Sequence, residues 1–182
     1  MSGCGSSSPI WWSSPGATVA LQGSNASLPP GESGIRRVVG WREWLALPAL
    51  GIDRLQCKID TGTRIAALHA LDVEPFRQGG QLHVRFRLYP LHGDERTSVR
   101  CSAPISDQRQ IRSSNGLRER RFVIQTRMVL GPIHQEIEIT LADRGPMRFG
   151  MLLGRQSLVD GGWLVDPARA FAHGRPVPGI PV

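Results

Sequence analysis

The chain has 182 residues, enough for one domain with a substantial hydrophobic core but too few for two similar lobes, so a site built from two halves would need two chains. Its formal net charge is +7, almost all from arginine, because Lys58 is the only lysine. That excess is expected either from codon usage or from an anionic partner. No apolar run approaches the roughly 18 to 20 residues that span a bilayer. Three cysteines without C-x-x-C spacing give neither a disulfide framework nor a zinc knuckle, and we expect a soluble, cytoplasmic protein.

Residues 1–34 are expected to form a disordered low-complexity tail. Ser, Gly and Pro supply 19 of these 34 positions and Glu32 is the only charge, a composition that buries too little to offset its ordering entropy. The segment also lacks the positive n-region and continuous apolar h-region of a signal peptide. The composition changes at Ile35, so we predict a folded domain over 35–170 and a second tail over 171–182.

The first predicted elements lead to an Asp-Thr-Gly sequence that begins at Asp60. Before it, Pro48 breaks any helix that residues 42–47 begin. Residues 55–59, LQCKI, place apolar side chains on one face and polar ones on the other, as in a half-buried strand. The apolar run 65–71 follows. The carboxyl group of Asp60 is therefore expected where two buried strands are joined.

Further strands are predicted from alternating side chains. Residues 82–88 alternate apolar and polar positions, as a half-buried strand requires, and residues 137–141 repeat the pattern. Residues 120–130 favour another strand with a partly buried second face. The polar, glycine-containing segment 91–95 separates two strand candidates, which predicts a hairpin.

Helical pattern is scarce. The only short candidate follows Gly154, in RQSLVDGG, and stops at a glycine pair. Many short strands with turn signals between them favour a closed or sandwiched all-β domain, here with one short helix near the C-terminal end.

The Asp-Thr-Gly sequence is a weak signal by itself, because roughly one chain in 25 of this length would contain it by chance. A buried carboxylate nevertheless needs a function or a partner, since an unpaired buried charge is costly. A second stretch, MLLGRQSL at 151–158, has two apolar residues, a glycine, an arginine and a helix start. The residues alone leave Asp60 as either a catalytic carboxylate or a turn residue.

The two stretches together resemble retropepsin-type aspartic proteases, in which an apolar-apolar-Gly element packs behind an Asp-Thr-Gly loop. The chain is more closely similar to one bacterial family, usually labelled ATP-dependent zinc proteases and associated with the ATP-grasp glutamate ligase RimK. The resemblance covers about residues 36–168 and includes, in order, GWREWLALPALGI (40–52), KIDTGTRIAALHA (58–70) and ITLADRGPMRFGMLLGRQSL (139–158). The family usually has Ala-Arg-Thr-Ser at 63–66, where this chain has Thr-Arg-Ile-Ala.

The resemblance implies an all-β, retropepsin-like closed acid-protease barrel and a homodimeric aspartic-type peptidase. Each copy would supply one Asp60, and the two carboxylates would share a proton and activate water. Thr61 would join the two loops across the dimer, and Gly62 would allow close approach of backbone and substrate. Structural support would come from Leu153, Gly154 and Arg155. The last of these needs a partner, with Asp143, Asp160 or a backbone carbonyl as the alternatives.

The segment 100–130 carries seven arginines against two acids. Planar guanidinium groups suit the bidentate capture of carboxylates, although a solvated hairpin would have the same composition. We expect a groove for an acidic peptide, lined by Arg64, Arg109, Asn115, Gly116 and Arg121. The resemblance implies a poly-glutamate peptide or a glutamylated protein as substrate, and an ATP-grasp ligase as a partner.

No cofactor or metal is predicted, because the five histidines are scattered singly and no glycine-rich phosphate loop is present. The alternative function is a non-catalytic binding module for an acidic peptide or a ligase. Nucleic-acid binding is disfavoured, since the strands lack interleaved exposed aromatic residues. Two hairpin tips, around Gly93 and around Asn115, are alternatives for a flap. Lys58 either favours an ionised Asp60 or is carried to the surface by strand twist.

Overall fold

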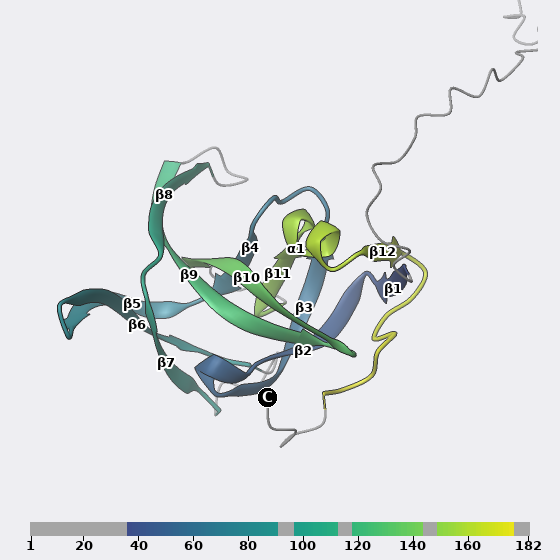
Figure 1. Cartoon of the computed structure of the whole chain (residues 1–182), viewed down its shortest axis with the longest axis horizontal. Helices are drawn as coiled ribbons and strands as arrows, with labels where there is room; N and C mark the ends of the chain where they lie inside the picture. Colours follow the sequence, from purple (N-terminus) through teal and green to yellow (C-terminus); the bar gives the residue numbers. More distant parts are fainter. Residues whose placement is uncertain (1–35, 91–96, 113–117, 144–148, 177–182) are drawn as a thin grey trace, which may run out of the picture. The chain divides into compact units, whose positions relative to one another are not determined.

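The structure, a computed structural model, describes residues 36–90, 97–112, 118–143 and 149–176, which all fall within the unit Gly34–Val182 (Figure 1). The elements in chain order are β1 (Arg37–Gly40), β2 (Arg42–Leu47), the 3-10 turn η1 (Pro48–Leu50), β3 (Ile52–Asp60), β4 (Ala66–His69), β5 (Leu71–Gln78), β6 (Gln81–Leu88), β7 (Val99–Pro104), β8 (Asp107–Arg112), β9 (Arg118–Leu130), β10 (Ile133–Ala142), β11 (Met151–Gly154), α1 (Arg155–Asp160) and β12 (Trp163–Asp166). In this part of the chain, no helix has the length and apolar character needed to cross a membrane.

The main sheet closes on itself. Its strands follow the order β10-β4-β11-β3-β2-β9, and β9 pairs back with β10, while β8 adds to the free part of the long strand β9. Closure removes exposed sheet edges from these strands. The predicted all-β barrel with one short helix near the C-terminal end is confirmed.

The alternating patterns place the barrel core. On β3, the side chains of Leu55, Cys57 and Ile59 are buried, as the alternation in 55–59 predicts. Leu68 of β4 and Met151 of β11 are fully buried beside them. Each fully buried side chain of this size contributes about 1.5–3 kcal/mol by leaving water. The core therefore fixes the strands that end at the Asp-Thr-Gly loop.

Residues 42–47, directly before Pro48, form strand β2 and not a helix. Five of its six residues are buried, because its outer face is covered by the chain after β12. There the ring of Phe171 stacks on Trp44 with 5.6 Å between centroids. The buried carboxylate of Glu43 accepts hydrogen bonds from the amides of Gly40 (2.6 Å) and Ala172 (3.0 Å). The segment expected as a second tail thus begins with residues that pack on the domain.

A smaller sheet, of order β5-β6-β7, lies beside the barrel (Figure 1). Strands β6 and β7 are antiparallel, so the predicted hairpin is confirmed, while its turn lies outside the described residues. The β5–β6 pairing shifts register between Leu71 and Glu74, which marks a β-bulge.

Candidate active site

Asp60 is the last residue of β3, a strand that pairs with β2 on one side and with β11 on the other. Strand β11 lies between β3 and β4, parallel to β3 and antiparallel to β4. In that register Gly154 is directly opposite Asp60, and Leu153 is opposite Ile59. The two sequence stretches that suggested a site are therefore neighbours, and Leu153 is fully buried behind the loop.

The carboxylate of Asp60 is held by its own loop. Its Oδ1 accepts hydrogen bonds from the backbone amides of Gly62 (3.0 Å) and Thr63 (3.2 Å), and its Oδ2 accepts one from the Thr63 hydroxyl (2.8 Å). An added Cβ at Gly62 would lie 3.2 Å from Oδ1, so glycine gives the amide room to approach. The loop fixes the orientation of a half-buried carboxylate without using any side chain from another element.

These contacts set the charge of Asp60. Burial alone would raise the pKa of Asp60, but the hydroxyl and amide of Thr63, the amide of Gly62 and the charge of Lys58 together hold the pKa below its ordinary value of 3.8. Lys58 itself is exposed, so both alternatives stated for it hold: it reaches the surface and still favours the ionised carboxylate. In a single copy, Asp60 is ionised at neutral pH.

The loop is backed by the junction of β11 and α1. The amide of Arg155 donates to Thr63 O (2.9 Å) and the amide of Gln156 donates to Arg64 O (3.0 Å). An added Cβ at Gly154 would lie 2.7 Å from the carbonyl oxygen of Arg64, a backbone atom that cannot turn away. Only glycine fits at this position without moving the loop.

Arg155 has a backbone partner. Its Nη1 donates to the carbonyl oxygens of Thr61 (3.3 Å) and Gly62 (3.0 Å). Of the alternatives named from the sequence, the structure thus selects the backbone carbonyl, and Asp160 instead accepts from Gln156 (2.9 Å). The guanidinium therefore ties α1 to the Asp-Thr-Gly loop that it faces.

The arginines expected to line a groove have different surroundings. Arg64 is exposed, two residues before β4, and makes no ion pair with another described residue. Arg109 binds both oxygens of Glu138 (2.8 and 3.0 Å) and also Asp107 (2.6 Å), and these bonds raise its pKa. Arg121 is buried and pairs with Glu119 through two hydrogen bonds, while Asn115 and Gly116 lie outside the described residues. Arg64 has no ion-pair contact with a described residue, but its charge lies close enough to Glu138 to help lower the pKa of that carboxyl group.

The two hairpins considered for a flap stand at different ends of the barrel. Strand β10 runs parallel to β4 with Ile139 opposite Ala66, so Glu138 and its partner Arg109 lie beside the start of β4. The β8–β9 hairpin therefore rises at the same end as the β3–β4 loop (Figure 1). Tyr89, which leads into the β6–β7 turn, lies next to Gly150 before β11, at the end away from Asp60. Both tips themselves lie outside the described residues.

Two polar residues at this end were not singled out from the sequence. Thr63 supplies two of the three donors to Asp60. Its role could have been predicted from the sequence, because an Asp side chain in a turn commonly accepts hydrogen bonds from residues two and three positions later. Glu138 takes up Arg109 from 29 positions away, a pairing that no local pattern announces. Within the described ranges, no cluster of three or more His, Cys, Asp or Glu side chains could hold a metal ion.

Comparisons with known proteins agree with the barrel fold and the Asp-Thr-Gly loop described above. The sequence matches the model of the RimB-like family, described as retropepsin-like aspartic endopeptidase RimB, over residues 38–176. A solved structure of a protein of unknown function from Legionella pneumophila superposes with a TM-score of 0.64 at 24% identity, covering 76% of this chain and 99% of that one. This likeness shows the fold.

Curated relatives carry a different name. Proteins named probable alpha-L-glutamate ligase are 38% identical over 137 residues in Shewanella pealeana and 39% identical over 139 residues in Desulfotalea psychrophila. The matches cover 75% and 76% of this chain but 30% of each relative. The chain thus spans less than a third of the length of these relatives.

Proposed function

Because the chain belongs to the RimB-like family of retropepsin-like aspartic endopeptidases, we propose that it hydrolyses peptide bonds with Asp60 as one half of a carboxylate pair. The second half would be Asp60 of another copy of the chain. The observation that carries this proposal is the position of Asp60, at the open end of a buried strand with three donors fixing its carboxylate. The β11–α1 junction also donates hydrogen bonds to the carbonyls of Thr63 and Arg64, and an ordinary Asp turn needs no such backing from a second part of the chain.

The pair would divide acid and base roles. Two carboxylates in contact cannot both ionise easily, so one stays protonated while the other is a base. The ionised carboxylate takes a proton from water as the water oxygen bonds to the scissile carbonyl carbon. The protonated one gives its proton to the carbonyl oxygen. In the second step the C–N bond breaks as the amine takes a proton from the carboxyl group that received it, while a hydroxyl of the tetrahedral diol returns its proton to the other carboxylate, so the new acid is released and the pair again holds one proton.

The exposed part of the loop is the proposed meeting place of two copies. Thr61 and Gly62 are both exposed, although they adjoin the buried end of β3. A single copy offers one ionised carboxylate and no acid, because its loop already lowers the pKa of Asp60. A second Asp60 would raise one of the two pKa values and so create the acid.

An acidic, glutamate-containing peptide is the proposed substrate. The ligase name of the curated relatives favours a product of glutamate ligation, since the matching segment is part of those longer chains. The exposed guanidinium of Arg64, two residues after Gly62, makes no direct ion pair with a described residue and would bind a carboxylate near the scissile bond. The β8–β9 hairpin, which stands at this end, would lie along the bound peptide (Figure 1).

Cleavage of a glutamate-rich peptide by the Asp60→Asn variant tests the proposal. We expect the rate to fall by at least about 10³-fold, because the amide can neither accept nor share the proton. Asp53→Asn is the matched control, since Asp53 is an exposed acid of the same strand, and we expect its rate to match the wild type. Mass spectrometry of the products gives the bond cleaved. Undiminished cleavage by Asp60→Asn, together with loss of activity in a chelator, would reject the mechanism.

A binding module is the second candidate, and the curated relatives favour it in one respect. Their matching segment belongs to a chain with its own named activity, and such a segment can serve to hold a substrate for the rest. Sedimentation at micromolar concentration separates the two candidates. A monomer whose binding of acidic peptide is unchanged by Asp60→Asn would favour the module, because a single carboxylate forms no pair.

A further inference from the structure

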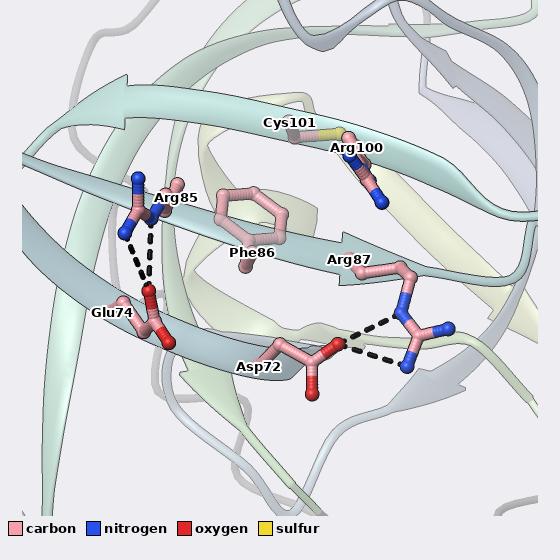
Figure 2. A pocket seen from close by; sticks show the side chains of 7 residues that line it. All are labelled: Asp72, Glu74, Arg85, Phe86, Arg87, Arg100 and Cys101. Carbon is pink, nitrogen blue, oxygen red and sulfur yellow. Dashed lines mark hydrogen bonds and ion pairs between the residues drawn. The ribbon is translucent and has the colours of Figure 1, made fainter.

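The three-stranded sheet β5-β6-β7 carries a pocket of its own, with a volume of about 530 Å³ (Figure 2). It is lined by Asp72, Glu74, Arg85, Phe86, Arg87, Arg100 and Cys101. We propose that this pocket is a second binding site, for a carboxylate group of a peptide, and that Arg100 is the residue that binds it. The volume lies in the range of small-ligand sites.

Two of the three arginines in the pocket are already paired. Arg85 donates to Glu74 through Nε (2.9 Å) and Nη2 (2.8 Å), and Arg87 donates to Asp72 in the same way (2.9 and 2.8 Å). Figure 2 shows the two ion pairs on either side of Phe86. Arg100 is exposed and makes no ion pair with another described residue, and it stands on the neighbouring strand β7. Among the residues that line the pocket, one guanidinium is therefore unneutralised.

The register of the sheet places a second guanidinium beside Arg100. Arg100 is directly opposite Arg87 in the β6–β7 pairing. Like charges at directly opposite positions destabilise a sheet, whereas an opposite charge there would stabilise it. The single carboxylate of Asp72 serves Arg87 and leaves Arg100 without an acid from the described part of the sheet. A carboxylate bound beside Arg100 would supply the countercharge that Asp72 gives to Arg87.

The backbone at Asp72 supports a built site. Asp72 has a φ of +52°, a left-handed conformation that costs a residue with a side chain about 1 kcal/mol or more, and it lies in the bulge of β5. The bulge directs its carboxylate to Arg87. Strained residues of this kind cluster at binding sites, where the strain sets a functional side chain in place.

The charges in the pocket favour a carboxylate over a nucleic acid. The lining has three arginines and two acids, which leaves an excess of one positive charge. One carboxylate neutralises it, but a row of closely spaced phosphates would also meet Asp72 and Glu74. The site is separate from Asp60, because β4 runs away from the Asp-Thr-Gly loop before β5 begins. Binding at this pocket does not depend on the chain having peptidase activity.

Peptide binding to the full chain carrying Asp60→Asn tests the site without turnover. The probes are fluorescent tetraglutamate with an amidated C-terminus, tetraglutamine with a free C-terminus, and a thymidine tetranucleotide, each followed by anisotropy. We expect Arg100→Ala to weaken binding of a carboxylate probe about tenfold. Arg36→Ala removes the same charge from an exposed position before β1, and we expect a change under about twofold. The probe affected shows whether a side-chain or a terminal carboxylate binds.

Stability provides the second readout. Arg100→Glu places a carboxylate opposite Arg87, so we expect an equal or higher melting temperature together with loss of peptide binding. Equal weakening by Arg36→Ala, no weakening by Arg100→Ala, or a larger effect of Arg100→Ala on the tetranucleotide would overturn the proposal. The peptidase proposal is judged separately, because retained cleavage by Asp60→Asn would reject it without changing the dependence of binding on Arg100.

Discussion

The Asp60 loop and the β5-β6-β7 sheet both present polar groups, but they hold them differently. At the loop, backbone amides and carbonyls take part in nearly every contact, joined by the Thr63 hydroxyl and the Arg155 guanidinium, and buried strands lie directly before and behind the loop. At the sheet, exposed side chains hold one another in ion pairs. Backbone contacts fix a position to within a narrow range, whereas exposed ion pairs exchange partners at little cost. The first arrangement suits a reacting group and the second suits a surface that admits a ligand.

The largest expected effect is at the backbone contact behind the loop. Gly154→Ala would place Cβ 2.7 Å from the Arg64 carbonyl oxygen, so β11 or the loop must shift. We expect a loss of about 1–3 kcal/mol in the free energy of unfolding, measured by urea denaturation. Peptide cleavage should fall as well, because the shift moves Asp60.

Gly62→Ala is the matched control for that substitution. Its Cβ would meet only the carboxylate of Asp60, at 3.2 Å, and a side chain can give way. We expect a loss of stability well below that of Gly154→Ala. Equal losses would mean that the backbone at Gly154 is no more confined than the exposed loop.

The next effect concerns the charge of Asp60. Thr63→Val removes the hydroxyl that donates to Oδ2, so the pKa of Asp60 should rise toward or beyond its ordinary 3.8. A carboxyl group whose pKa is lower in the folded chain than in the unfolded chain stabilises the fold at pH values above its unfolded pKa. That stabilisation is lost as the pH falls through its folded pKa. The variant should therefore be about 1 kcal/mol less stable at pH 7, with the difference shrinking below about pH 4.

Carboxyl NMR titration of the Thr63→Val variant measures the pKa directly. Thr61→Val serves as the control, because the Thr61 hydroxyl makes no hydrogen bond to Asp60 in one copy of the chain. An unchanged pKa of Asp60 in the Thr63 variant would show that the loop amides alone set it.

The smallest effect is expected at the exposed ion pairs. Arg85 and Glu74 have side-chain exposures of 64% and 59%, so their pairing is well screened by water. Glu74→Gln should reduce stability by less than about 1 kcal/mol, and the difference should vanish near 1 M salt. A larger loss that salt does not reduce would mean that this sheet is held as rigidly as the loop.

Sequence patterns predicted the parts of the fold where one face is buried. In β6 the alternation holds from Val84 to Leu88, although Leu82 is 42% exposed. In β10 it holds from Ile137 to Ile139 and fails at Thr140, which is buried because this end of the strand is covered on both faces. The stretch 42–47 gave no such signal, since β2 is buried on both faces and its cover comes from Phe171. A contact at that separation cannot be read from local periodicity.

In the candidate site, too, some residues could be identified from the sequence, while the partner of Arg109 could not. Asp60 and the β11–α1 stretch were identified because their order of residues is distinctive, and the structure places Gly154 opposite Asp60. The role expected for Arg109 depended on its having no acid nearby. Glu138 supplies that acid from another strand, a fact that only the closed barrel reveals.

The insertion of β11 between β3 and β4 also has a consequence for synthesis. The strands beside it are complete by His69, yet β11 and the helix that backs the loop end at Asp160. Contacts across such a separation form late and slow folding, because the intervening chain must first be brought together. A nascent or truncated chain that lacks these residues would contain Asp60 without its supported loop. The loop that carries Asp60 therefore gains its backing only when nearly all of the barrel has been made.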